Sequence, residues 1–176
     1  LIKFDKLTGL PDYEGFKRKA AKTLRVHPNQ NYVIVLSDII NFKYINYAFG
    51  YETGNSVLCA YAKFLRDDKN NVCVCRMFSD HFVCLRKVHD FAKIAETIIA
   101  NNKKFSALAN RSLPDASLLI VSGICKLDKG IDIKEAVDKS NIAKKTLKNY
   151  AKTDCAVFSE EMALELTRKM EITNLM

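Results

Sequence analysis

Residues 38–58 read DIINFKYINYAFGYETGNSVL, and residues 72–85 read VCVCRMFSDHFVCL. The first segment continues an apolar strand predicted over residues 32–38, and Asp38 lies at the end of that strand. The second segment reads as a strand, a turn and a strand, with Asp80 at the tip of the hairpin. Two carboxylates on neighbouring strand ends can hold Mg²⁺ against a triphosphate. The two segments therefore predict a candidate metal site at one end of a sheet.

The hydrophobic pattern around these segments changes between helical and strand periods. Helices are predicted over residues 12–25, 53–67, 88–101 and 133–150, and strands over residues 32–38, 118–125 and 156–158, with a hairpin over residues 72–86. The continuous apolar run at 118–125 predicts a central strand. A last helix is expected after Ser159, which we take as its capping residue. This mixed order predicts an α+β sheet with helices packed on it.

Composition limits the class of protein. The chain has 176 residues, of which 48% are hydrophobic, and this fits one domain with a full core. No run of eighteen apolar residues is present, so we expect no membrane span in this segment. The sequence starts Leu-Ile-Lys-Phe-Asp without a signal peptide, as we expect of a domain excised from a longer protein.

The six cysteines are irregularly spaced and contain no C-x-x-C pair, so we expect neither a disulfide framework nor a metal site from them. Cys73 and Cys75 alternate along one strand and should face the same side. If Ser79 and Asp80 form a two-residue turn, Cys84 lies opposite Cys75. This pattern predicts a reduced, sulfur-rich core face and a cytoplasmic location.

The formal net charge is +8, which suits an anionic partner such as a nucleotide, a nucleic acid or a membrane surface. Most basic residues are dispersed, but lysines concentrate over residues 139–152. That stretch is either a phosphate-binding segment or a solvated helix face. A nucleic-acid-binding domain is the less favoured alternative, because no aromatic–basic stacking surface or recognition motif is present.

Six segments, in order, resemble motifs of the GGDEF domain, the diguanylate cyclase family of bacterial signalling proteins. They are DKLTGLPD at 5–12 for D-x-L-T-G-L-x-N, DIINFK at 38–43 for D-x-D-x-F-K, Asn46 for the Asn of I-N-D, GYETGN at 50–55 for G-H-x-x-G-D, FSDHF at 78–82 for the signature itself, and SNIAKKTLKNYAK at 140–152 for A-D-x-A-L-Y-x-A-K-x-x-G-R. The resemblance covers nearly the whole chain. It implies a nucleotidyl-cyclase-like fold with a central, mostly antiparallel sheet of about five strands flanked by helices.

The resemblance also implies a domain organisation. Residues 1–158 are expected to form the degenerate GGDEF domain, and residues 159–176 a C-terminal linker helix. In this family such a helix often leads into a following phosphodiesterase (EAL) domain. We therefore expect an adjacent EAL-type or sensory domain in the full-length protein.

A GGDEF domain that makes cyclic di-GMP binds GTP with Mg²⁺ and works as a head-to-head dimer. The resemblance assigns Asp38 and Asp80 to the metal, although both residues equally suit a helix cap and a turn. His81 replaces the acidic residue that follows Asp80's position in the signature. No residue is therefore assigned a catalytic role, and Asp80 and His81 are interpreted as vestiges of one.

The resemblance places Lys43, Lys148 and Lys152 at phosphate-contacting positions, where Lys152 replaces an Arg and loses its bidentate geometry. Phe78 and Ser79 replace the two signature glycines, which let the backbone approach the phosphates. Phe78 should either fill the substrate cleft or force a different hairpin turn.

Members of the family recognise guanine with the side chains of an Asn and an Asp. Asn46 keeps the first, but Asn55 replaces the second, so one contact to guanine becomes donor against donor. A buried mispairing of this kind costs on the order of 1–3 kcal/mol. Residues 69–72 read KNNV where the family's product-inhibition motif has R-x-x-D.

The sequence thus predicts a degenerate GGDEF domain of cyclic di-GMP signalling, without cyclase activity, that serves as a regulatory or nucleotide-binding module. GTP or ATP with Mg²⁺ and a second copy of the domain are the expected partners. The alternative is a weakly active diguanylate cyclase that uses Asp38 and Asp80 with Mg²⁺.

Overall fold

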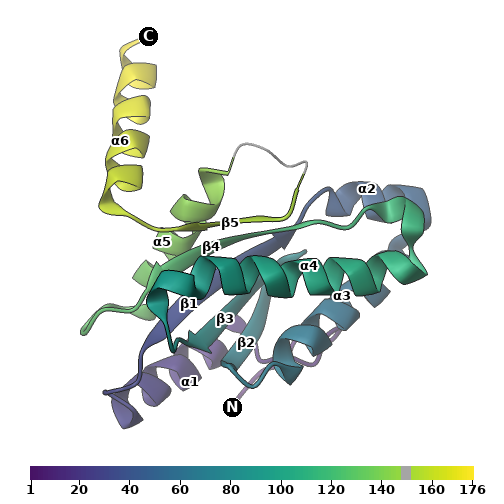
Figure 1. Ribbon diagram of the computed structural model, residues 1–176, viewed down its shortest axis with the longest axis horizontal. Helices are drawn as coiled ribbons and strands as arrows, with labels where there is room; N and C mark the ends of the chain where they lie inside the picture. The colour runs from purple at the N-terminus through teal and green to yellow at the C-terminus, as the bar shows by residue number, and fades with distance from the viewer. Residues whose placement is uncertain (148–151) are drawn as a thin grey trace.

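The computed structural model describes residues 1–147 and 152–176. Within these residues, five strands form one sheet, in the order β2-β3-β1-β4-β5, with helices on both faces (Figure 1). The elements are α1 (Tyr13–Val26), β1 (Tyr32–Ile39), α2 (Phe42–Phe49), α3 (Tyr51–Asp67), β2 (Asn71–Phe78), β3 (His81–Lys87), α4 (Ile94–Ser112), β4 (Ile120–Lys126), α5 (Ile133–Lys145), β5 (Asp154–Val157) and α6 (Glu160–Leu175).

Strand β1 is the middle of the sheet. It pairs antiparallel with β3 on one side and with β4 on the other, β2 pairs antiparallel with β3, and β5 pairs parallel with β4. The predicted α+β fold with a mostly antiparallel five-stranded sheet is confirmed. The prediction that the apolar run at 118–125 forms the central strand was wrong. β4 is an interior strand beside β1, and both are covered on both faces, so their hydrophobic patterns are alike.

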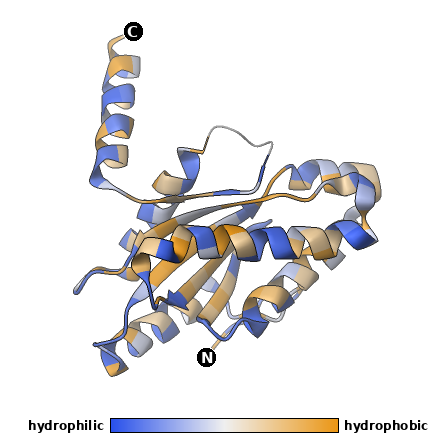
Figure 2. Ribbon diagram, viewed as in Figure 1, coloured by the Kyte–Doolittle hydropathy of each residue, from blue (hydrophilic) through white to orange (hydrophobic). Residues whose placement is uncertain are grey.

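The two faces of β1 support two separate cores. Val33, Val35 and Ile39 face a cluster that includes Tyr61 of α3 and Phe105 of α4. Tyr32, Ile34 and Leu36 face the opposite cluster, with contributions from α1 and α5. Figure 2 shows the strands as largely hydrophobic, while hydrophilic residues recur along the helices. This alternation decides which β1 side chains face α5, and so which of them can reach the candidate site.

The β2–β3 hairpin differs from the expected register. Val74 lies opposite Cys84 and Val83 lies opposite Cys75, because the register shifts between Arg76 and Phe78. The prediction that Cys84 lies opposite Cys75 was therefore wrong, and Cys84 belongs to the other core. An irregularity of this kind adds one residue to one strand and turns the following side chains to the opposite face.

All six cysteines are free, and four of them are buried. Cys73, Cys75 and Cys125 lie in one core cluster, whereas Cys84 lies in the other. Burial raises the pKa of the Cys73 thiol to about 12, with a small opposing effect of Lys19. Thiols of this kind behave as small hydrophobic groups.

Several helix boundaries also differ from the predicted ones. A 3₁₀ turn at Phe91–Lys93 precedes α4, which continues eleven residues past the expected end, to Ser112. The helix predicted over 133–150 ends at Lys145, and the last part of that prediction falls on residues 148–151, outside the described residues. Ser159 precedes α6, but its side chain makes no capping hydrogen bond.

Helix α6 projects away from the sheet (Figure 1) and buries none of its residues. Leu164, Leu166, Met170 and Ile172 remain exposed along it. The proposed division at residue 158 separates this helix from the compact part of the chain and stays a prediction. Among the described residues, no helix is long and apolar enough to cross a membrane.

Gly123 of β4 determines how closely α5 approaches the sheet. A Cβ atom at this position would lie 1.9 Å from the backbone oxygen of Ser140 and 2.9 Å from Cβ of Lys144. The neighbouring Ser140 hydroxyl donates to the carbonyl of Ile34 on β1, at 3.3 Å. The absence of a side chain at Gly123 therefore fixes the position of Lys144 over the end of β1.

We expect Gly123→Ala to lower the free energy of unfolding by at least about 1–3 kcal/mol, because α5 has to move off the sheet to admit the methyl group. Urea unfolding followed by circular dichroism measures this change. Ser56→Ala, at an exposed position of α3, serves as the control and should stay within about 0.5 kcal/mol of the parent. An unchanged stability for Gly123→Ala would contradict the close packing of α5.

Candidate functional site

The predicted carboxylates lie where the sequence placed them, at the end of β1 and at the tip of the β2–β3 hairpin. Asp38 is directly opposite His81 of β3 in the antiparallel register. Residues in such a pair project on the same face and their side chains can interact. That face is the one covered by α5, which brings Lys144 to the same point.

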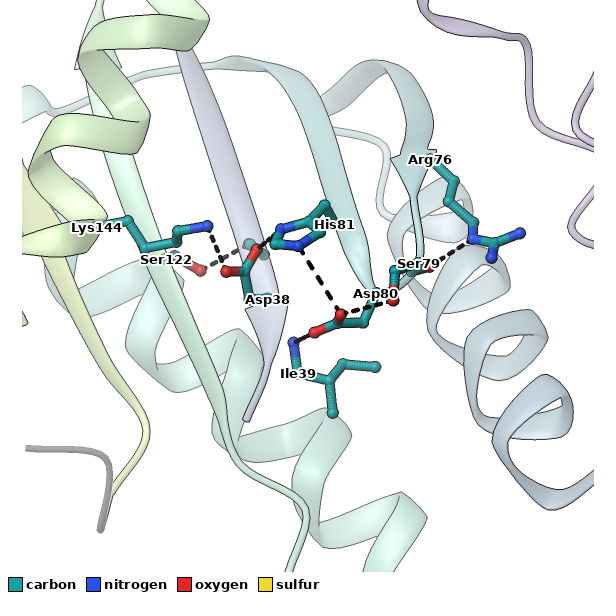
Figure 3. A network of polar contacts seen from close by, with 9 residues as sticks. Asp38, Ile39, Arg76, Ser79, Asp80, His81, Ser122 and Lys144 are labelled. Atoms are coloured by element: carbon teal, nitrogen blue, oxygen red, sulfur yellow. Dashed lines mark hydrogen bonds and ion pairs between the residues drawn. The ribbon is translucent and has the colours of Figure 1, made fainter. Parts of the chain in front are cut away.

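Both oxygens of the Asp38 carboxylate are occupied by cationic or donor groups of the chain (Figure 3). Nδ1 of His81 lies 2.5 Å from Oδ1, a contact that requires the proton on Nδ1. The ammonium group of Lys144 donates to Oδ2. The Lys144 side chain is 8% exposed, so its charge lies in the protein interior, where it pairs with the Asp38 carboxylate. These three residues are called the Asp38 cluster below.

The Asp38 cluster favours the ionised carboxylate. Burial raises the pKa of Asp38, but the hydrogen bonds from His81 and Lys144 and the charge of Lys144 outweigh burial and hold it below its usual range. The carboxylate is therefore charged at neutral pH and already neutralised by the chain.

Asp80 makes structural contacts with the end of β1. Its Oδ2 accepts a hydrogen bond from the backbone N–H of Ile39 at 3.0 Å, and the Ser79 hydroxyl donates to its Oδ1 at 3.2 Å. Nε2 of His81 lies 4.0 Å from the same Oδ1, so the imidazole stands between the two carboxylates (Figure 3). Asp80 thus ties the hairpin tip to β1.

A Mg²⁺ ion takes oxygen ligands, and it needs free lone pairs on the carboxylates that hold it. In the Asp38 cluster those lone pairs accept from Lys144 and His81. Across residues 1–147 and 152–176, no group of three or more His, Cys, Asp or Glu side chains is arranged to hold a metal ion. The residues present do not fit Mg²⁺ in this arrangement.

The hairpin tip departs from a glycine turn in two ways. Phe78 is exposed, and its ring centroid lies 4.4 Å from that of His81. Ser79 adopts the left-handed region, with φ of 47°, where glycine is favoured. Arg76 supports this turn, because its Nε donates to the Ser79 carbonyl at 2.6 Å and its Nη1 contacts the Asp5 carboxylate at 3.1 Å.

Phe78 occupies part of a hollow of roughly 440 Å³ next to the Asp38 cluster. Asp38, His81 and Lys144 line it, together with Asn141 of α5. The Phe78 ring contributes to the wall of this hollow. The hairpin also has a register shift between Arg76 and Phe78 and a left-handed Ser79. Whether Phe78 fills a substrate cleft stays a prediction.

The residues predicted for base recognition lie on α2 and α3. Gly54 allows these helices to meet, because a Cβ on it would lie 1.8 Å from Oδ1 of Asn46. Asn55 is the next residue of α3 and is exposed, as is Lys43 in the first turn of α2. Among the described residues, no hydrogen bond or ion pair joins Lys43, Asn46 or Asn55 to the Asp38 cluster.

Of the two lysines predicted to contact phosphate near the end of the domain, only Lys152 lies among the described residues. Lys152 is exposed, and its ammonium lies 3.9 Å from the carboxylate of Asp154 at the start of β5. Lys148, predicted to contact phosphate, lies outside the described residues.

Sequence reasoning missed Lys144 as a site residue. Its signal was present, because Lys144 follows Val137 by seven residues and Ser140 by four, and all three are buried on one face of α5. In the segment SNIAKKTLKNYAK it also stands at the Leu of the quoted motif. A lysine at a buried helical position requires a partner, and here the partner is Asp38.

Comparison with known proteins agrees with this fold and with the order of motifs. Residues 2–153 match the family model "Diguanylate cyclase, GGDEF domain". The GGDEF domain of TpbB, or YfiN, from Pseudomonas aeruginosa is 20% identical, with a TM-score of 0.75 over 94% of this chain and 99% of that one. The fold is therefore that of the nucleotidyl-cyclase-like domains. The chain belongs to the GGDEF family, the diguanylate cyclase-like domains of cyclic di-GMP signalling.

Two further solved structures share the fold at low identity. The GGDEF domain of DgcB from Caulobacter crescentus, solved in complex with c-di-GMP, is 17% identical with a TM-score of 0.72 over 88% of this chain and 94% of that one. The active GGEEF domain of a diguanylate cyclase from Vibrio cholerae is 22% identical with a TM-score of 0.61 over 84% and 94%.

A curated relative is the uncharacterized protein y4lL of Sinorhizobium fredii, 36% identical over 89 residues. The match covers 49% of this chain and only 11% of that protein.

The lowered pKa of Asp38 gives a prediction about acid stability. The carboxyl of Asp38 has a pKa near 3.8 in the unfolded chain. The stability that its ionised form contributes is therefore complete above that pH and is lost as the pH falls through the lower folded pKa. We expect Asp38→Asn to be less stable than the parent at pH 7, with the difference shrinking below about pH 4. Urea unfolding at a series of pH values measures it, and a difference that is constant between pH 7 and pH 3 would contradict the assignment.

Proposed function

We propose that this chain is a degenerate GGDEF domain that does not make cyclic di-GMP and that acts as a regulatory module for an adjacent domain. The observation that carries the proposal is the neutralised carboxylate of Asp38. Diguanylate cyclase chemistry needs a divalent cation at this carboxylate to offset the charge of the triphosphate. Here Lys144 and His81 supply the positive charge and the donors from the chain itself.

The changes at the hairpin tip support the same proposal. Phosphate can approach the backbone of this turn closely only if the residue there has no side chain, and Phe78 places an aromatic ring at that position. Ser79 already adopts a strained backbone conformation. Asp80 is held by the backbone of Ile39 rather than directed at a ligand. No part of this turn is arranged as a phosphate cradle.

Residual nucleotide binding is compatible with the positions of Lys43 and Asn55. Both are exposed, on α2 and α3, where GTP or ATP could contact them, whereas Asn46 is half-buried against Gly54. Asn55 offers an amide in place of a carboxylate, so we expect binding there to be weak and poorly selective between GTP and ATP.

A regulatory role would be transmitted through α6. This helix projects from the domain with exposed Leu164, Leu166, Met170 and Ile172, and it packs lightly on α5. Because α5 also carries Lys144, a change at the Asp38 cluster can reach α6 through one helix. The proposed recipient is an EAL-type or sensory domain in the full-length cytoplasmic protein, or the same helix in a second copy of the chain.

The alternative function is a weakly active cyclase that uses Asp38 and Asp80 with Mg²⁺. One observation favours it, namely that both carboxylates reach the same end of neighbouring strands. It requires Lys144 and His81 to leave Asp38 when GTP and Mg²⁺ arrive.

We expect the purified protein to produce no detectable cyclic di-GMP from GTP with Mg²⁺ or Mn²⁺. The reason is that Lys144 and His81 neutralise the carboxylate of Asp38, which would otherwise bind the metal. Chromatographic analysis of the nucleotides after prolonged incubation is the measurement. Sustained cyclic di-GMP formation that Asp38→Ala abolishes would establish the alternative and overturn the proposal.

Replacing the two groups that contact Asp38 should open the site to a metal. We expect the double variant Lys144→Leu with His81→Glu to bind Mn²⁺, whereas the parent does not, since the variant frees Asp38 and adds a carboxylate next to it. Calorimetry with Mn²⁺ in the absence of nucleotide measures this gain. Lys134→Leu, an exposed position on the same helix, is the control and should behave as the parent. Mn²⁺ binding by the parent equal to that of the double variant would show that the Asp38 cluster does not exclude metal.

A further inference from the structure

A groove of roughly 440 Å³ lies between α3 and α4, on the face of the sheet opposite to α5. Phe64 of α3 and Phe105 of α4 form its floor, and their ring centroids are 5.4 Å apart. Leu108 lines the α4 side and is 46% exposed. The charged residues of the lining are Lys63 and Asp67, which pair with each other. This hollow is called the α3–α4 groove below.

The rim of the α3–α4 groove is cationic on the α4 side. Lys104 and Arg111 lie four residues before and three residues after Leu108, so they share its side of the helix. Both are exposed, and neither forms an ion pair among the described residues. After Glu96 in its first turn, α4 contains no acidic residue. The groove therefore suits an apolar segment that carries acidic side chains.

Helix α6 has this character and is left open by its own copy. It has 16 residues, it buries none of them, and it carries four glutamates against two basic residues. Leu164, Ile172 and Leu175 are exposed, and Glu161 and Glu171 lie one turn before the first and the last of them. A helix of this length without a buried face is marginally stable in water, so its apolar side chains need a surface on which to pack.

The α6 helix lies on the wrong side of the sheet to enter the groove of its own copy. Met162 and Leu166 line a shallow hollow with Ile142 of α5, and from there α6 projects away from the molecule (Figure 1). Leu164 is two residues from both, which turns it away from α5. A second copy can bring its α6 to the groove, and mutual exchange of the two helices about a twofold axis closes the assembly.

We propose that two copies of this chain associate by exchanging α6, so that each α6 lies in the α3–α4 groove of the other copy. The apolar side chains of α6 pack on Phe64, Phe105 and Leu108, and its glutamates lie beside Lys104 and Arg111. In a helix-in-groove contact of this kind, apolar anchors supply affinity and charges set the register. The contact does not require the loss of cyclase activity, so this proposal and the proposed function can fail separately.

The test measures the oligomeric state of the chain by sedimentation velocity from about 1 µM to about 500 µM, where we expect a monomer–dimer equilibrium. One variant, Lys104→Glu with Arg111→Glu, reverses the charge of the rim. The other, Glu161→Lys with Glu171→Lys, reverses that of α6. All four positions are exposed. Each variant brings like charges together, so we expect each to raise the dissociation constant of the dimer at least about tenfold.

An equimolar mixture of the two variants is the deciding sample. In a mixed dimer, the reversed α6 meets the reversed rim and the unmodified α6 meets the unmodified rim, so we expect dimerisation close to that of the parent. Lys19→Glu with Lys22→Glu, at exposed positions of α1, matches the charge change of the rim variant and should dimerise as the parent does. Circular dichroism verifies that each variant is folded.

Three results would overturn the proposal. The first is a chain that stays monomeric at about 500 µM, which would leave the groove to a helix of a different protein. The second is equal weakening in the rim variant and in the α1 control, which would show a response to net charge alone. The third is a mixture of the two reversed variants that dimerises no better than either variant by itself, which would show that α6 and the groove do not meet.

Discussion

The contact between Lys144 and Asp38 joins the two parts of the molecule on which the site depends, the end of the central strand and the helix that covers it. Gly123 and Ser140 bring α5 close enough to the sheet for this contact, and Lys144 is buried as a result. A buried ammonium is tolerated only with an ionised partner, so Asp38 must remain charged and unavailable to another cation. His81 completes the arrangement from the neighbouring strand. The orientation of α5 and the charge state of Asp38 thus follow from one interaction.

The same principle explains the rest of the signature. Side chains around the hairpin tip make contacts within the chain. Asp80 accepts from the backbone of Ile39, Arg76 holds the Ser79 carbonyl and the Asp5 carboxylate, and the Phe78 ring lies against His81. Each contact holds the hairpin tip to its neighbours. The core and the hairpin tip occupy different residues, so the fold does not depend on which side chains the signature carries.

The positive charges of the chain are unevenly matched by carboxylates. The chain carries a formal charge of +8, and five cations line one hollow without a neutralising carboxylate. At the Asp38 cluster the positive charge of Lys144 is matched by a carboxylate, whereas Arg18, Lys19 and Lys22 of α1 form no ion pair among the described residues. The two regions lie at opposite ends of β1, so each could change without disturbing the other.

The sequence by itself determined the family, the α+β class and the position of the two carboxylates, because these depend on local periodicity and on motifs read in order. It also indicated that Phe78, Ser79 and His81 alter the signature. It could not determine that β1 rather than β4 is central, since both strands are buried on both faces and look alike. The register of Cys84 depended on an irregularity near Met77 that no residue pattern marks. The partner of Lys144 was decided by the tertiary structure alone. Residues 38 and 144 are 106 positions apart, and only the packing of α5 on Gly123 brings them into contact.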